Sequence, residues 1–156
     1  MASVCFIADP DADPRESLLS FETARQALST YELTEPYDNA LQLETVSLGA
    51  AVALLDDLTW YLRRTINEAI VLEPSIDSNE WLSRELATAI REETISPADT
   101  TELVKVYGVD DNRLVEPMYA ERRRDGSIPA YDLREVDSTL VVRVSERAFG
   151  GISPRS

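Results

Sequence analysis

The chain contains no histidine, one cysteine and one lysine among its 156 residues. Without histidine it can form neither a Ser-His-Asp triad, nor a Cys-His pair, nor a zinc site with imidazole ligands. Because Cys5 is alone, an internal disulfide and an iron–sulfur cluster are excluded as well. Any catalysis would depend on carboxylates, arginine, tyrosine, hydroxyl groups or Lys105, and any metal would be a hard cation bound by oxygen.

Long apolar runs are also missing. The longest aliphatic stretch, residues 49–55 (GAAVALL), is far too short to cross a bilayer. The first residues, MASVCFIADPD, have no basic region ahead of their apolar stretch and so lack the form of a secretory signal. The five glycines form no phosphate-binding spacing, which excludes a P-loop and a dinucleotide fingerprint. We therefore expect a cytoplasmic protein that makes no membrane contact.

Acidic residues are abundant instead. The chain has 29 Asp and Glu against 15 Lys and Arg, which gives a formal net charge of -14. In molar salt the Debye length falls to about 3 Å, so repulsion among surface acids largely vanishes. A surplus of acid with almost no lysine is therefore what we expect of a salt-adapted protein. The same charge disfavours nucleic acid as a partner, while a hydrophobic content of 44% is typical of a folded chain.

The residue patterns predict an α/β fold, organised as one domain over residues 1–150 with a flexible tail at 151–156. Three strands, each followed by a helix, are predicted at 3–8, 39–47 and 68–72. Three further strands, antiparallel to one another, are predicted at 103–109, 113–120 and 138–144, the first two joined by a turn at 110–112. We therefore expect a single-domain α/β sandwich with a mixed sheet, in which three βα units precede antiparallel C-terminal strands.

Acidic residues follow two of the predicted strands. Asp9 and Asp11 come after the first strand, and Glu73 comes after the third. In an open α/β sheet ligands bind at the carboxyl edge of the strands, so these carboxylates can converge on Mg²⁺ or another hard divalent cation. The alternative is that they are caps and surface acids in an acidic chain. No other cofactor is expected.

The layout IADPDAD after the first strand and IVLEPSI at the third resembles a response-regulator receiver domain. That resemblance implies a regulatory, divalent-metal-binding function. The chain departs from the receiver pattern in two respects. Its third-strand acid is Glu73 where a receiver has the phosphate-accepting aspartate, and Lys105 lies inside a strand-like run, with no fifth strand identified to supply the expected lysine.

Two further features are candidates for partner binding. Arg122, Arg123 and Arg124 form the only basic cluster, and their guanidinium groups suit phosphate, RNA or an acidic protein. The alternative is a polar turn paired with the chain's own acids. Trp60 falls beside the inner stripe of its predicted helix, so we expect it to be partly exposed and available for contact.

Four segments together, ETARQAL (22–28), VSLGAAVALLDDLTWYL (46–62), EWLSRELATAIR (80–91) and VYGVDDNRLVEPMY (106–119), resemble a group of small acidic proteins of halophilic archaea. This group has no assigned activity, so the resemblance implies no catalytic residues. It implies a salt-adapted cytoplasmic protein. Our leading hypothesis is a non-enzymatic α/β domain that binds a protein partner or self-associates. The alternatives are the divalent-metal regulatory domain and nucleic-acid contact through Arg122–Arg124.

Overall fold

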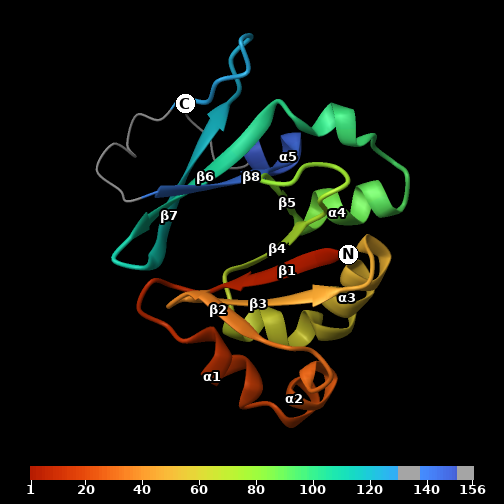
Figure 1. Cartoon of the computed structure of the whole chain (residues 1–156), viewed down its shortest axis with the longest axis vertical. Helices are drawn as coiled ribbons and strands as arrows, with labels where there is room; N and C mark the ends of the chain where they lie inside the picture. Colours follow the sequence, from red (N-terminus) through yellow and green to blue (C-terminus); the bar gives the residue numbers. More distant parts are fainter. Residues whose placement is uncertain (130–137, 151–156) are drawn as a thin grey trace.

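The computed structural model describes residues 1–129 and 138–150 (Figure 1). In this part of the chain eight strands form one mixed sheet, in the order β2-β3-β1-β4-β5-β8-β6-β7. The strands are β1 (Ala2–Ile7), β2 (Thr34–Tyr37), β3 (Ala40–Thr45), β4 (Glu68–Leu72), β5 (Trp81–Ser83), β6 (Leu103–Asp110), β7 (Arg113–Glu121) and β8 (Ser138–Arg143). The helices are α1 (Pro14–Leu19), α2 (Glu22–Leu28), α3 (Leu48–Thr65), α4 (Arg84–Arg91), α5 (Glu146–Gly150) and a 3-10 turn at Pro97–Thr100.

The α/β content and the mixed sheet are confirmed, but the sandwich and the layout of three βα units are not. β1 lies between β3 and β4 and runs antiparallel to both. β3 and β4 therefore run in the same direction, and α3 connects them across β1. Among the described strands, β5 and β8 form the one neighbouring parallel pair. The extent of the single domain stays a prediction, and the predicted tail at 151–156 lies outside the described residues.

Local sequence signals explain where the helices begin. The Asp13 side chain accepts hydrogen bonds from the backbone N–H groups of Arg15 and Glu16, with Pro14 at the first helical position of α1. Ser47 caps α3 in the same way, through the N–H of Ala50. None of the described helices combines the length and the apolar character that a membrane span requires.

One helix starts later than its sequence suggests. The acids around Asp77 and Glu80 predict a helix start, but a short strand, β5, occupies Trp81–Ser83, and α4 begins at Arg84. Trp81 and Leu82 belong to the two separate hydrophobic clusters on opposite faces of the sheet. Only an extended backbone directs two consecutive side chains to opposite faces, so tertiary packing overrides the local cap signal.

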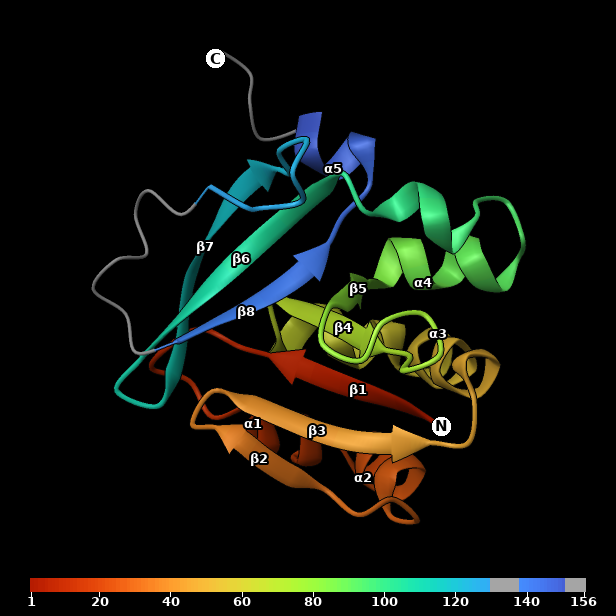
Figure 2. The same ribbon diagram turned by 45° about the horizontal axis from the view of Figure 1, so that its top comes forward.

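Helices α1 to α4 cover one face of the sheet, while the opposite face folds onto itself and also packs against Ala148 and Phe149 of α5. All six residues of β1 are buried, and alternate side chains point to opposite faces of the sheet. Val4 and Phe6 pack with helix residues such as Leu55, whereas Cys5 and Ile7 share a cluster with side chains of β4, β6 and β7. In Figures 1 and 2, β6, β7 and β8 lie above β1 and β3 and run at an angle to them, while α1, α2 and α3 lie against the first strands.

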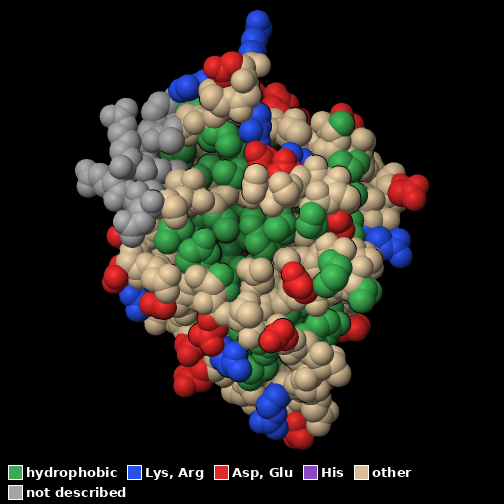
Figure 3. All heavy atoms as spheres, in the orientation of Figure 1, with side chains coloured by type: hydrophobic (Ala, Val, Ile, Leu, Met, Phe, Trp, Pro, Cys, Tyr) green, Lys and Arg blue, Asp and Glu red, His purple; other side chains and the backbone are tan. Residues whose placement is uncertain are grey.

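Asn39 joins the two ends of this curled sheet. Its Nδ2 donates to the carbonyl oxygens of Ala8 at 2.9 Å and Leu114 at 2.8 Å, and its Oδ1 accepts from the N–H of Leu114 at 2.9 Å. The side chain is fully buried. In the space-filling view, hydrophobic side chains gather in a hollow at the centre of one face, and most charged side chains lie around it (Figure 3).

Candidate functional site

The only lysine of the chain lies in the interior of the curled sheet. Lys105 on β6 places its Nζ 2.6 Å from Oε2 of Glu68, the first residue of β4, and their side chains are 12% and 14% exposed. The hydroxyl of Tyr107 donates to the other carboxylate oxygen, Oε1. β4 and β6 are not neighbours in the sheet, so the curl of the sheet brings these three side chains together.

The surroundings favour the protonated forms of Tyr107 and Cys5. Burial raises the pKa of Tyr107, and the negative charge of Glu68 raises it further. Burial also raises the pKa of the Cys5 thiol to about 12, with a smaller contribution from Glu68. Cys5 is therefore an inert buried side chain, in agreement with its position in a buried strand. Lys105 Nζ also lies 5.7 Å and 5.6 Å from the ring centroids of Tyr107 and Tyr119.

Two cavities border on the Glu68–Lys105 pair. The larger, about 470 Å³, borders on Glu68, Lys105 and Tyr107 together, and we call it the Lys105 recess. Its remaining wall is mainly aliphatic, with Ile7, Ala8, Pro10, Leu114, Val115 and Pro117, and its charged rim contains Asp9 and Glu116. The smaller, about 330 Å³, borders on Glu68 and Lys105 but not on Tyr107. A mostly apolar cavity with a few convergent polar groups is the usual form of a small-molecule site.

The structure does not bring Asp9, Asp11 and Glu73 together. The predicted site required parallel strands, but β1 and β4 are antiparallel, so Asp9 and Glu73 follow opposite ends of the sheet. Asp9 accepts a hydrogen bond from Asn67 Nδ2 at 2.6 Å, and Glu73 accepts from the N–H and hydroxyl of Ser75 in its own turn. Asp11 is exposed. Over residues 1–129 and 138–150, no group of three or more acidic, histidine or cysteine side chains is placed to hold a metal ion.

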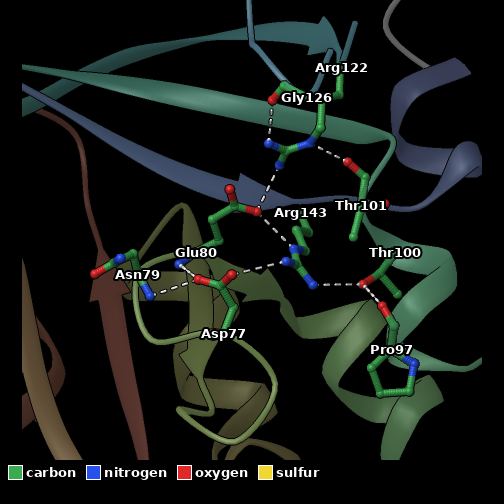
Figure 4. Close-up of polar contacts among 9 residues, drawn as sticks. All are labelled: Asp77, Asn79, Glu80, Pro97, Thr100, Thr101, Arg122, Gly126 and Arg143. Atoms are coloured by element: carbon green, nitrogen blue, oxygen red, sulfur yellow. Dashed lines mark hydrogen bonds and ion pairs between the residues drawn. The ribbon is translucent and has the colours of Figure 1, made fainter. Parts of the chain in front are cut away.

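The three arginines of the predicted basic cluster separate into one internal and two exposed side chains. Arg122 turns inward and donates to Glu80 Oε1 at 2.8 Å, to the carbonyl of Thr101 at 2.7 Å and to that of Gly126 at 3.1 Å (Figure 4). Arg123 and Arg124 are exposed. Arg122 therefore fits the alternative to partner binding, a polar turn paired with the chain's own acids, and Arg123 and Arg124 stay on the surface.

A buried arginine that the sequence reading missed completes this ion-pair network. Arg143 on β8 is 8% exposed in its side chain, and its Nε donates to the same Glu80 oxygen at 2.9 Å. Its other nitrogens contact Asp77 Oδ2 at 3.3 Å and Thr100 Oγ1 at 3.2 Å. Backbone N–H groups of Asn79 and Glu80 lower the pKa of Asp77, with smaller contributions from Arg143 and Arg122. The signal was available, since Arg143 interrupts the otherwise apolar run LVVRV.

Trp60 is exposed, as its position on the helix predicted. It is one of three large hydrophobic side chains exposed in the described part of the chain, with 52% of its surface accessible. Its ring lies edge-on to Phe21 and Tyr61, with centroids 5.7 Å and 5.0 Å away. The guanidinium of Arg64 stacks over the ring at 3.6 Å. We call these four side chains the Trp60 patch.

Sequence reasoning also missed the Lys105 recess. A lone lysine within LVKVYGV was a usable signal, because a charged residue in an apolar strand needs a partner. The partner, Glu68, is 37 positions away, and no local pattern identifies it.

The comparisons with known proteins give a family but no activity. A family model described as a family of unknown function (DUF5804) matches residues 2–109, which run from the start of β1 to the penultimate residue of β6 and leave β7 and β8 outside the match. No curated protein and no solved structure matches the chain. The expectation of an uncharacterised family is therefore confirmed: the chain belongs to the family of unknown function DUF5804.

Proposed function

We propose that this chain is a non-enzymatic domain of a salt-adapted cytoplasm that acts by binding protein, either a partner or a second copy of itself. The observation that carries the proposal is the exposure of Trp60. A tryptophan with 52% of its surface in contact with water keeps a large apolar area unburied. Tryptophan, tyrosine and arginine are also the residue types most enriched at the energetic centres of protein interfaces.

The side chains of the Trp60 patch contact one another without any partner present. Arg64 Nη1 donates to the carbonyl oxygen of Trp60 at 2.7 Å, which holds its guanidinium over the indole ring. Phe21 and Tyr61 support the indole from the side. Side chains that are already fixed lose less conformational entropy on binding, so more of the contact energy appears as affinity.

Charge determines the conditions under which this binding is expected. A second copy of a chain with a net charge of -14 is repelled at low ionic strength. In molar KCl the Debye length is about 3 Å, so this repulsion is screened while burial of the indole remains favourable. We therefore expect association through the Trp60 patch to strengthen with salt.

The test compares Trp60→Ala with Val46→Ala in molar KCl. Val46 is another exposed apolar side chain and lies outside the patch, so it is a matched control. Multi-angle light scattering gives the mass of each variant, and a pull-down in the same buffer detects a bound protein. Loss of a hot-spot side chain costs about 2 kcal/mol or more, so Trp60→Ala should weaken association by roughly 30-fold while Val46→Ala changes little. A wild-type chain that is monomeric and captures no protein contradicts the proposal, as does equal binding by both variants.

A further inference from the structure

The chain uses arginine at fourteen of its fifteen basic positions, and its one lysine occupies an interior position. Arginine offers a carboxylate two parallel hydrogen bonds, so an ion pair with Glu68 alone gives no reason for lysine. A lysine nitrogen differs in that it can lose its proton and act as a nucleophile. The position of Lys105 is therefore informative beyond its charge.

The groups around Nζ are those that a carbonyl addition needs. Glu68 lies 2.6 Å from Nζ and can take its proton. Tyr107 donates its hydroxyl to the second oxygen of Glu68 and so fixes the carboxylate in place. All three side chains border the Lys105 recess of about 470 Å³, which leaves space for a small molecule beside the nitrogen.

We propose that the Lys105 recess binds a small aldehyde or ketone covalently and reversibly, as an imine on Lys105 Nζ. Nζ first passes a proton to Glu68, and its freed electron pair forms a bond to the carbonyl carbon. The carbonyl π electrons move to oxygen, which takes the proton from Glu68. A second proton passes from nitrogen through Glu68 to this oxygen, water leaves, and the nitrogen electron pair forms the C=N bond.

The charges balance across this reaction. One ammonium and one carbonyl compound give one protonated imine and one water, and Glu68 ends as the carboxylate it was at the start. Because the protonated imine carries the same single positive charge as the ammonium, Glu68 neutralises the free and the bound state equally. The reaction therefore leaves no uncompensated charge in the interior, where one would be costly.

The walls of the recess select the carbonyl compound. Ile7, Leu114 and Pro117 present aliphatic surface, which suits an apolar body. Asp9 and Glu116 add two carboxylates at the rim, which repel an anionic ligand. We therefore assign the recess to neutral aldehydes and ketones with an aliphatic chain.

Reductive trapping tests this assignment on the full chain. The protein in molar KCl is incubated with butanal or with glyoxylate in the presence of cyanoborohydride, and peptide mass mapping locates the adduct. Lys105 and the α-amino group of Met1 are the two amines present, so the exposed terminal amine serves as an internal reference. We expect butanal to label Lys105 faster than the terminal amine, and glyoxylate to label the terminal amine faster than Lys105.

Two variants separate assisted from ordinary lysine reactivity. Loss of a positioned acid–base group lowers a rate by roughly 100-fold or more, so Glu68→Gln should slow labelling of Lys105 by that factor without affecting the terminal amine. Glu85→Gln, which alters a carboxylate beside the smaller cavity, should leave the rate unchanged. Labelling of Lys105 that is no faster than in the urea-unfolded chain, or that is equal in wild type and Glu68→Gln, overturns the proposal. Trp60→Ala should not alter labelling, so failure of the protein-binding proposal is observed separately.

Discussion

Replacing Glu80 with alanine removes the carboxylate at the centre of the ion-pair network in Figure 4. One oxygen of Glu80 accepts from Arg122 Nη2 at 2.8 Å and from Arg143 Nε at 2.9 Å. These contacts join the segment before β5 to β8 and to the end of β7. The network therefore connects parts of the sheet that are distant in sequence, and its loss should destabilise the whole fold.

The expected cost follows from the burial of the partners. Arg143 is 8% exposed and would keep only Asp77, at 3.3 Å, and Thr100 as polar partners. Removing one member of a buried pair and leaving the other charge behind costs about 3–5 kcal/mol. Because Glu80 is itself 19% exposed and Arg143 keeps two contacts, we expect the lower end, about 3 kcal/mol, for Glu80→Ala.

Urea unfolding in molar KCl measures this difference, with Glu35→Ala as the control. The Arg15–Glu35 pair spans 3.5 Å between side chains that are nearly half exposed, and an exposed pair contributes at most about 1 kcal/mol. Glu80→Ala should therefore cost at least about 2 kcal/mol more than Glu35→Ala. Equal costs for the two variants would refute the claim that the network stabilises the fold.

Two further predictions concern the interior of the curled sheet. Asn39→Ala removes three buried hydrogen bonds and leaves backbone groups of Ala8 and Leu114 unpaired, so the free energy of unfolding should fall by about 3 kcal/mol. Hydrogen exchange should accelerate first at the Leu114 amide, and an exchange rate at that amide equal to that of the wild type would contradict the role of Asn39. The pKa of Tyr107 in the folded chain lies above its unfolded value of about 10, so the native state holds this proton more tightly. The resulting contribution to the free energy of unfolding is present below about pH 10 and is lost as the pH rises above that value. In urea unfolding above pH 10, the free energy of unfolding should fall less steeply with pH for Tyr107→Phe than for the wild type. An equal fall in both proteins would contradict the raised pKa of Tyr107.

Local signals in the sequence identified several elements correctly. A helix was predicted after each of the first strands, and Asp13 and Ser47, residue types that favour the N-cap, begin α1 and α3. The turn between β6 and β7 was predicted from Asp110-Asp111-Asn112, and Asp111 and Asn112 both have positive φ, at 53° and 61°. Aspartate and asparagine tolerate this conformation better than most residues, so the residues of the turn are sufficient to predict it.

The direction and pairing of the strands could not be predicted in the same way. Hydrophobic periodicity shows which faces of a strand are buried, but it carries no information on which neighbour the strand pairs with or in which direction. β1 has the pattern of a central strand whether its neighbours are parallel or antiparallel. The metal hypothesis depended on parallel strands and therefore placed Asp9 and Glu73 at the same edge of the sheet.

The long-range polar contacts could not be predicted either, because they depend on which distant segments the fold brings together. Glu80 is 42 residues from Arg122 and 63 from Arg143. In a chain with 29 acids, each arginine has many candidate partners, and only the fold selects among them. Exposure of Trp60 could be predicted because it depends on the periodicity of one helix, which is a local property.

The most direct test of the proposed function is the solvent reactivity of Trp60 in the associated state. Hydroxyl-radical footprinting in molar KCl reports the oxidation rate of each tryptophan, and buried Trp81 provides an internal reference. The protein-binding proposal predicts that oxidation of Trp60 falls when the chain self-associates or binds its partner, while that of Trp81 stays low. Oxidation of Trp60 at the same rate in the free and the associated protein would contradict it.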